Sequence, residues 1–431
     1  MTRLRRFIGA SVAGAALMAL GSPAFAAEPA FAVAAAAPAN DAVGKFYASR
    51  AGALLWLRQG ADSSAARELI GALERAPLDG LSNGPALATQ AQLLLARAQT
   101  GDPAAITEAD RLLSTAWVLY VQALQRPPMG MSFADNWAKP RQQSAQEILQ
   151  RAANASSLAA HVRTISEVNP VYAQIRDAAW TQLQSTGGAP DSRVLASLDR
   201  IRATPFQKRY VIVDAGSARL WMVQDGRIVD SMKVIVGKPS AQTPAIASTI
   251  YYATLNPYWH VTPDLVRTLI AKNVLEQGYG YLKTHGYQLF TSYGDDAVQL
   301  SPDKVDWKAV AAGQQTVEVR QLPGPGNSMG HLKFGFANPY DIYLHDTPNK
   351  DLFAQDDRDL SHGCIRLEDA ERLGRWMLGQ EPMPASTTPE QHVTLPTPIP
   401  IYITYLTAQP DGGQLGFVDD VYGRDSVSAG S

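Results

Sequence analysis

The hydrophobic pattern of this chain changes character near residue 205, and this change constrains the fold more than any other feature. Before it, apolar residues recur every three or four positions, as Leu113, Ala116 and Tyr120 do. After it, short runs rich in valine, isoleucine and tyrosine are separated by turn signals such as Asp225-Gly226. The first pattern predicts helices and the second predicts strands. We therefore expect an α+β protein with a helical N-terminal half and a mainly β C-terminal half.

Helix-start signals support the first half of this prediction. Asp102 stands before a proline as a cap, and Asp191 is placed to cap the last helix before the change. Ser144 and Glu147 have the spacing of a capping box. The predicted helical domain covers residues 41–203.

The second half, residues 204–426, carries mainly strand signals. Strands are expected at residues 210–213, 220–223, 228–236, 248–255, 316–322, 341–345 and 401–406. Asp225-Gly226 predicts a tight hairpin between the second and third of these strands. Helices are expected at residues 263–275 and 367–378.

The N-terminus has the features of a secretory signal peptide. Basic residues among the first six precede an apolar run over residues 7–20 and a small-residue cleavage pattern ending at Ala26. We expect residues 1–26 to be removed and residues 27–40, rich in alanine, to form a flexible leader. The apolar run is short for a bilayer and no later run of about 20 apolar residues follows, so no membrane span is expected after cleavage.

Charge and cysteine content narrow the function. The chain has 38 basic and 40 acidic residues and a formal net charge of -2, which removes the electrostatic reason to propose nucleic acid as a partner. It has one cysteine, Cys364, so an exported protein could form no internal disulfide. This residue is therefore a core side chain, an intermolecular link or a working thiol.

The segment most informative about chemistry is residues 343–367. His345 is expected to end a strand, and residues 361–364 (SHGC) are expected to form a loop that opens onto a helix. A helix N-terminus and a nearby imidazole both lower the pKa of a thiol. Gly363 permits a close backbone approach, and free amides near Cys364 could hold an oxyanion. The pattern indicates an acyl-transfer site with Cys364 as nucleophile and His345 as its base.

These motifs resemble a known family. A histidine followed after 15 residues by Ser-His-Gly-Cys resembles the signature of the L,D-transpeptidases with a YkuD-type catalytic domain. Further similar segments are FYASRAGALLWL (46–57), VIVGKPSAQTP (234–244), LNPYWHVTP (255–263), LPGPGNSMGHLKF (322–334), IPIYITYLTAQ (399–409) and VYGRD (421–425). Together they resemble the YcbB-like branch of that family over roughly residues 41–426.

The resemblance implies a domain organisation. Residues 41–203 would be a helical scaffold domain. Residues 204–426 would be a YkuD-type β-sandwich with a capping subdomain at about residues 256–335. The branch usually has a separate peptidoglycan-binding module between these parts, whereas residues 186–205 here form only a short connection.

The resemblance also implies an activity in the periplasm or cell envelope. Cys364 would attack the third residue of a tetrapeptide stem, release D-alanine and form a thioester. An amine of a neighbouring stem would then form a 3-3 cross-link, whereas water would give L,D-carboxypeptidase activity. Neither cofactor nor metal is expected, carbapenems should acylate Cys364, and cell-wall synthases are candidate partners in wall biogenesis and cell shape.

Roles for the residues around the thiol follow from the same resemblance and from side-chain chemistry. Ser361, His362 and Gly363 are expected to shape the oxyanion loop, with His362 as a hydrogen-bonding residue. The group that orients His345 is either the Asp346 carboxylate or a backbone carbonyl.

Three residues are expected at the substrate. Arg366 stands where the broad family usually has asparagine and can bind a stem-peptide carboxylate in bidentate geometry. Tyr343 lies two positions before the catalytic histidine on the same strand face, and is expected to line the groove. Trp259 is expected to form a wall of the substrate site.

Three alternatives stay open at this point. Another cysteine peptidase or amidase would use the same thiol and imidazole. A non-catalytic wall-binding protein would keep the fold without needing the thiol. A metal site is the third, although the spacing of its candidate ligands matches no common zinc pattern: His331, His345, His362 and Cys364.

Overall fold

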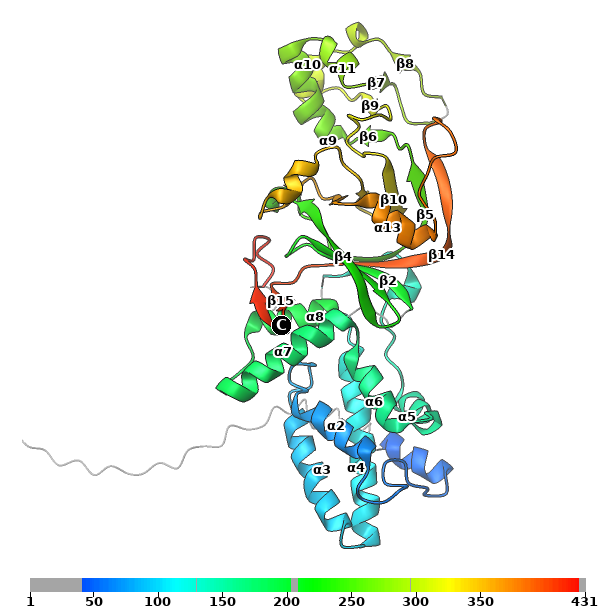
Figure 1. Cartoon of the computed structure of the whole chain (residues 1–431), viewed down its shortest axis with the longest axis vertical. Helices are drawn as coiled ribbons and strands as arrows, with labels where there is room; N and C mark the ends of the chain where they lie inside the picture. The colour runs from blue at the N-terminus through cyan, green and yellow to red at the C-terminus, as the bar shows by residue number, and fades with distance from the viewer. Residues whose placement is uncertain (1–40, 129, 203–207, 295, 426–431) are drawn as a thin grey trace, which may run out of the picture.

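The computed structural model describes residues 41–128, 130–202, 208–294 and 296–425 (Figure 1). The expected signal peptide and leader, residues 1–40, lie outside the described residues. So does the expected boundary between residues 203 and 204.

The N-terminal half is helical, as predicted. The described chain starts with a helix over residues 41–49, which a turn-rich segment follows. The later helices are α2 (Ser64–Glu74), α3 (Gly84–Ala98), α4 (Pro103–Leu124), α5 (Ala145–Asn154), α6 (Leu158–Glu167), α7 (Pro170–Thr186) and α8 (Ser192–Ile201). The predicted caps are confirmed: Asp102 accepts a hydrogen bond from the backbone of α4, and Asp191 does the same for α8. Ser144 and Glu147 form the predicted capping box of α5.

One buried carboxylate ties the start of this half together. Asp110 on α4 accepts hydrogen bonds from the backbone N–H groups of Leu55, Trp56 and Leu57 at 2.7–2.8 Å. Asp110 is fully buried, so these donors have no access to replacement water. The carboxylate thus holds an irregular loop against the helix.

We predict that Asp110→Ala destabilises the protein far more than removal of a cap on the same helix. Three buried N–H groups would lose their acceptor, at a cost of about 3 kcal/mol or more. Asp102→Ala should cost about 1 kcal/mol. Urea unfolding of both variants, followed by circular dichroism at the helical band, measures the difference. Equal losses would contradict the assigned role of Asp110.

The C-terminal half is built on one large sheet, to which the helical half adds the short strand β1 (Ser132–Phe133). The other strands of this sheet are β2 (Arg209–Asp214), β3 (Arg219–Gln224), β4 (Arg227–Gly237), β5 (Ile246–Leu255), β10 (Leu332–Phe336), β11 (Tyr343–His345), β12 (Asp359–Ser361), β13 (Ile365–Leu367) and β14 (Gln391–Thr404). The strand order is β1-β5-β10-β11-β13-β4-β3-β2-β14, and β12 pairs with β4. Because β14 pairs with β2 on one side and with β5 on the other, the sheet closes on itself.

The predicted strands fall on observed ones, and the largest difference is in the extent of β14. The hairpin at Asp225-Gly226 is confirmed, and both residues have the positive φ that suits a tight turn between twisted strands. Strand β14 begins at Gln391, well before the predicted residue 401. Its proline-rich middle lies in a register shift between Thr394 and Ile399, which hides the strand pattern.

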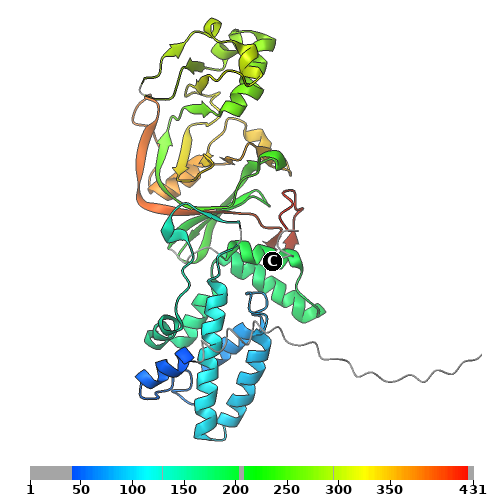
Figure 2. The same cartoon turned by 180° about the vertical axis from the view of Figure 1, so that it is seen from behind.

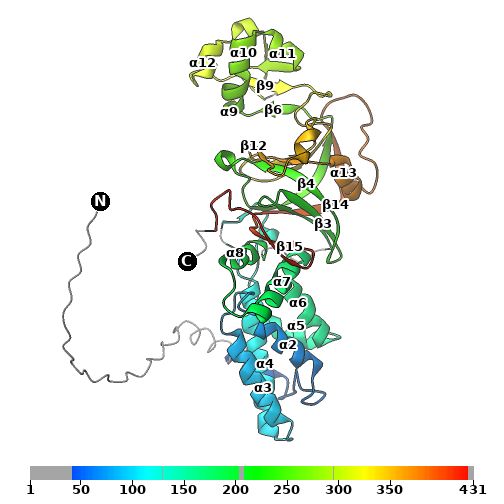
Figure 3. The same cartoon turned by 60° about the vertical axis from the view of Figure 1, so that its left-hand side comes forward.

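A separate small unit is inserted between β5 and β10. We call residues 259–321 the inserted segment. It contains β6 (Trp259–Val261), α9 (Pro263–Leu265), a π-helical turn (Val266–Ile270), α10 (Ala271–Gln277), α11 (Gly280–Thr284), β7 (Tyr287–Phe290), β8 (Gln299–Leu300), α12 (Trp307–Ala311) and β9 (Glu318–Gln321). Its strands form a sheet of their own and its apolar side chains a core of their own. In Figures 1 and 3 it lies at the end of the molecule opposite α2, α3 and α4.

The helical half and the closed sheet share one hydrophobic core. Tyr210, Trp221 and Tyr402, from the outer face of the sheet, belong to the same buried cluster as Leu198 and Ile201 of α8. The last helix of the sheet domain, α13 (Ala370–Leu378), packs into the inner core of the sheet. The hairpin of β15 (Ala408–Asp411) and β16 (Gln414–Phe417) returns to α7, as Figure 2 also shows from behind.

This arrangement confirms the predicted α+β class, with a helical region followed by a mainly β domain. Across the described ranges, no helix combines the length and apolar character needed to cross a bilayer.

Candidate active site

Four of the predicted site residues meet where two neighbouring strands of the large sheet lie side by side: Tyr343, His345, Cys364 and Arg366. Strands β11 and β13 run parallel, with Leu344 opposite Ile365 and His345 opposite Arg366. Residues two apart on a strand share a face, so Tyr343 lies on the same face as His345. The same register places Cys364 beside Tyr343. The other face carries Leu344 and Ile365, which are fully buried in the inner core.

We call the face of the sheet that carries Tyr343 and His345 the outer face. Lys333, on the neighbouring strand β10, lies on the same face. Lys333 on β10 lies opposite His345 in the antiparallel register. Its Nζ is 5.5 Å from the ring centroid of Tyr343. Sequence reasoning missed this residue, because its place is set by strand register rather than by a motif.

The sequence prediction for the segment after the cysteine is wrong in one respect. Cys364 does not open onto a helix, because strand β13 follows it and helix α13 begins only at Ala370. The thiol therefore gains nothing from a helix N-terminus. Pairing of residues 365–367 with β4 and β11 overrides the local helical pattern.

A backbone carbonyl orients the imidazole of His345. The ring is buried, with 3% of its surface exposed, and its Nδ1 lies 2.5 Å from the carbonyl oxygen of Asp346. A carbonyl can only accept, so Nδ1 carries the proton and Nε2 is left as an acceptor. The Asp346 carboxylate is occupied elsewhere, by Lys350 Nζ at 2.7 Å and by the N–H of His331 at 3.0 Å.

Both members of the pair are uncharged at neutral pH. Burial, together with the positive charges of Arg366 and Lys333, lowers the pKa of His345 to about 3. Burial raises the pKa of Cys364 to about 11, against a smaller lowering by Tyr343. The expected lowering of the thiol pKa is therefore wrong: the sulfur is closely surrounded by protein, although its residue keeps partial solvent exposure.

This protonation state predicts the pH dependence of thiol reactivity. Because the pKa of Cys364 is raised, the reactive thiolate fraction grows about tenfold per pH unit up to about pH 11. Alkylation by iodoacetamide should follow that slope from pH 6 to pH 10. Cys364 is the sole cysteine, so the mass of the intact protein reports it directly. A rate that levels off below pH 8 would instead indicate a thiolate–imidazolium pair.

Tyr343 lies beside the thiol of Cys364. Its backbone and its side chain both interact with the sulfur, and Cys364 Sγ also lies 3.7 Å from the carbonyl oxygen of Asp341. The Tyr343 ring meets the ring of His345 edge-on, with 6.0 Å between centroids. Within the described ranges, no hydrogen bond joins the His345 ring to the sulfur.

The SHGC loop, residues 361–364, is held by its own serine. Ser361 is buried, and its hydroxyl donates to the carbonyl of Cys364 at 2.6 Å and accepts from the N–H of Gly363 at 3.0 Å. The N–H of Gly363 is thus already bonded to Ser361 and is not a free oxyanion donor. Gly363 has φ of 114°, and a Cβ there would lie 3.0 Å from Ile342 Cδ1. This position therefore requires glycine.

His362 is exposed and takes part in a separate contact. Its Nε2 lies 3.1 Å from Lys238 Nζ, which can only donate, so this nitrogen accepts. Burial and the charges of Lys238 and Arg366 lower the pKa of His362. The contact agrees with a hydrogen-bonding role in the loop.

Trp259 belongs to the core of the inserted segment. Only 8% of its surface is exposed, and it packs in the core of the inserted segment near Tyr287. Strand alternation turns its exposed neighbour His260 the other way. Lys333 contributes to lowering the pKa of His260, after the larger effect of burial, so His260 lies near the outer face of the site. Tyr343 packs against the same core, which brings the inserted segment over β11.

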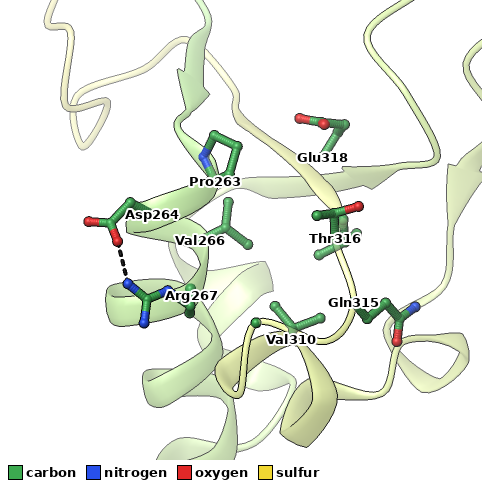
Figure 4. Close-up of a pocket in the computed structure, with 10 residues that line it drawn as sticks. Pro263, Asp264, Val266, Arg267, Val310, Gln315, Thr316 and Glu318 are labelled. Carbon is green, nitrogen blue, oxygen red and sulfur yellow. Dashed lines mark hydrogen bonds and ion pairs between the residues drawn. The ribbon is translucent and has the colours of Figure 1, made fainter.

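The inserted segment also carries a pocket of about 290 Å³ that is partly open to solvent (Figure 4). It lies between α9 and the approach to β9, and its lining includes Val266, Val310 and Glu318. Asp264 and Arg267 form an ion pair of 2.5 Å on one side. Their charges balance each other, so the pocket presents no strong net charge there.

The described residues include no group of three or more histidine, cysteine or acidic side chains able to hold a metal ion. The metal alternative therefore has no support from the geometry of His331, His345, His362 and Cys364.

Comparison with known proteins decides the family. The profile of the L,D-transpeptidase catalytic domain (YkuD) matches residues 208–401, and that of the Scaffold domain matches residues 41–178. The chain carries an L,D-transpeptidase catalytic domain of the YkuD family, preceded by a Scaffold domain. A candidate L,D-transpeptidase of Haemophilus influenzae is 27% identical over 398 residues, which are 88% of this chain and 77% of that protein.

Solved L,D-transpeptidases are more distant. The enzyme of Mycobacterium smegmatis is 14% identical over 47% of this chain and 60% of its own, with a TM-score of 0.24. A carbamoyl enzyme formed with avibactam is 12% identical over 47% of this chain and 51% of its own, with a TM-score of 0.22. The chain thus spans about half of the latter structure. The assignment of the two domains rests on the sequence matches alone.

Proposed function

We propose that this L,D-transpeptidase forms 3-3 cross-links between peptidoglycan stem peptides through a thioester on Cys364. One observation carries the proposal beyond family membership. Tyr343, His345, Cys364 and Arg366 share the outer face of two paired strands, and Nε2 of His345 is left as a proton acceptor.

The first half of the reaction acylates the thiol. Cys364 Sγ attacks the carbonyl carbon of the third stem residue while its proton passes to Nε2 of His345. The C–N bond to D-alanine then breaks, and the leaving amine takes the proton from His345. Because the pKa of the thiol is raised and that of the imidazole is lowered, proton transfer accompanies the attack and does not precede it.

The second half returns the thiol. The amine of a neighbouring stem attacks the thioester, its proton passes through His345 to the departing sulfur, and a new amide bond forms. The inserted segment acts here as a cap that limits the access of water. Amine is then favoured over water as acceptor.

The N–H of Cys364 is our candidate donor to the oxyanion. Gly363 N–H is already bound to Ser361, which leaves the next amide along the chain. A nucleophile's own amide lies close to the carbonyl that it attacks.

Arg366 would bind a carboxylate of the donor stem. Within the described ranges its guanidinium forms no hydrogen bond and no ion pair, and burial lowers its pKa. A largely buried cation of this kind is stabilised by a bidentate carboxylate ligand. The D-alanine carboxylate of the donor is such a ligand.

The same proposal covers the cellular setting. The expected signal peptide would export the chain to the periplasm, where stem peptides are the substrate and cell-wall synthases are candidate partners. Carbapenems would acylate the same thiol, because their carbonyl also requires a nucleophile and an oxyanion donor.

The test is incubation of the mature protein with disaccharide-tetrapeptide, followed by mass spectrometry of protein and products. We expect an acyl adduct on Cys364, released D-alanine and 3-3 dimers. Disaccharide-tripeptide without dimers would assign the chain as an L,D-carboxypeptidase instead. An unmodified protein with unchanged substrate would reject both activities.

A further inference from the structure

Two segments meet next to the SHGC loop. Both resemble family motifs, but neither has a part in the proposed chemistry. They are residues 237–243 and residues 418–425. The hydroxyl of Tyr422 donates to the carbonyl of Gly237 and accepts from the N–H of Thr243, the latter at 3.3 Å. The C-terminal segment therefore holds both ends of the 237–243 turn.

Thr243 connects this turn to the residue before the nucleophile, Gly363. It is fully buried, and its hydroxyl accepts from the N–H of Gly237 and donates to the carbonyl of Gly363, both at 2.8 Å. That carbonyl belongs to the peptide bond that carries the N–H of Cys364. A trans peptide is planar, so fixing its carbonyl also fixes the direction of its N–H.

Arg424 adds further hydrogen bonds between the C-terminal segment and the 237–243 turn. Its Nη2 donates to the carbonyl of Thr243 at 3.0 Å and to Oε1 of Gln242 at 2.9 Å. Its guanidinium also lies 4.8 Å from the ring centroid of Tyr422. Gln242 in turn donates to the carbonyl of Tyr422 at 3.2 Å.

The C-terminal segment is itself anchored to the helical half. Arg200 on α8 donates to the Asp425 carboxylate and to the carbonyl of Arg424, each at 2.8 Å. The Arg200 and Asp425 side chains are only 12% and 15% exposed, so solvent screens the pair weakly. Asp420 accepts from the backbone of Asp425 and from the hydroxyl of Tyr405, each at 2.8 Å.

We infer that Thr243 and Tyr422 are positioning residues that aim the N–H of Cys364 at the oxyanion. They do so through a chain of hydrogen bonds that begins on α8 of the helical half. The inference rests on the proposed function for its catalytic consequence. Its structural part, a restrained Gly363–Cys364 peptide, stands without that function.

The test compares two reactions of the same thiol. Acylation by disaccharide-tetrapeptide develops an oxyanion, whereas alkylation by iodoacetamide does not. Thr243→Val should lower kcat of acylation about 10- to 100-fold with KM within about threefold, and should change alkylation less than about threefold. Thr243→Ser, which keeps the hydroxyl, should restore most of the rate. Tyr422→Phe should lower acylation about tenfold by the same route.

Matched controls come from the same domain. Thr404 and Tyr402 on β14 are buried, and their hydroxyl groups have no hydrogen-bond partner within the described ranges. Thr404→Val and Tyr402→Phe should leave both reactions unchanged. Equal losses of acylation and alkylation in Thr243→Val would overturn the inference, because they would indicate general disruption of the site.

Hydrogen–deuterium exchange keeps the test independent of activity. Peptides spanning residues 361–367 should exchange faster in Thr243→Val than in Thr243→Ser. If the wild-type protein fails to react with the tetrapeptide, the proposed function fails while this difference still supports the restraint. Unchanged exchange in Thr243→Val would overturn the inference whatever the activity.

Discussion

Replacement of Cys364 by serine should lower the rate of acyl-enzyme formation by about 10⁴-fold or more. A serine hydroxyl is a much weaker nucleophile than a thiol, and the lowered pKa of His345 makes that imidazole too weak a base to activate an alcohol. Single-turnover reaction with disaccharide-tetrapeptide, followed by intact mass, measures the loss. Serine has nearly the volume of cysteine, so the melting temperature should change by no more than about 2 °C.

Chemical capping of the wild-type thiol provides a second version of this experiment. Because the chain has one cysteine, iodoacetamide modifies a single thiol. Cross-linking activity should fall in step with the fraction of alkylated protein. Activity that survives complete alkylation would show that the thiol is not the nucleophile and would support a non-catalytic or different role for the fold.

His345→Gln should lower acylation about 10²- to 10⁴-fold. Glutamine can still donate to the carbonyl of Asp346, so the local fold is kept, but it offers no basic nitrogen to the Cys364 proton. The measurement is kcat with the tetrapeptide at fixed pH. In Cys364→Ser/His345→Gln the two losses should not add, because nucleophile and base act as one unit.

His331→Gln is the matched control. His331 is an exposed histidine near the site, and only its backbone N–H contacts Asp346. Its replacement should leave kcat within about twofold of the wild type. Near wild-type activity in His345→Gln would mean that another group, such as His362, accepts the proton.

Local elements of the fold were predictable from the sequence. The caps at Asp102, Ser144 and Asp191 and the hairpin at Asp225-Gly226 all appear where they were expected. Each depends on a few adjacent residues, whose hydrogen bonds and backbone preferences are the same in any fold. The change from helix to strand near residue 205 has the same local origin.

Short paired strands were not predictable in this way. Strand β13 has three residues, and its apolar positions continue into the pattern of α13, so a helix was expected from residue 367. Hydrogen bonds to β4 and β11 decide its conformation. The burial of Trp259 was not predictable for a related reason: an aromatic side chain shows its burial only when its neighbours in space are known.

By itself, the sequence determined which side chains are available for the chemistry, namely one thiol and a histidine at family spacing, and which local elements carry them. Only the tertiary structure decided that Lys333 and Arg366 lie on the face of His345, that a backbone carbonyl sets its tautomer, and that thiol and imidazole are both neutral. The reason is that pKa values and side-chain directions depend on burial and strand register. Burial and strand register are both set by residues that are neighbours in space but lie far apart along the chain.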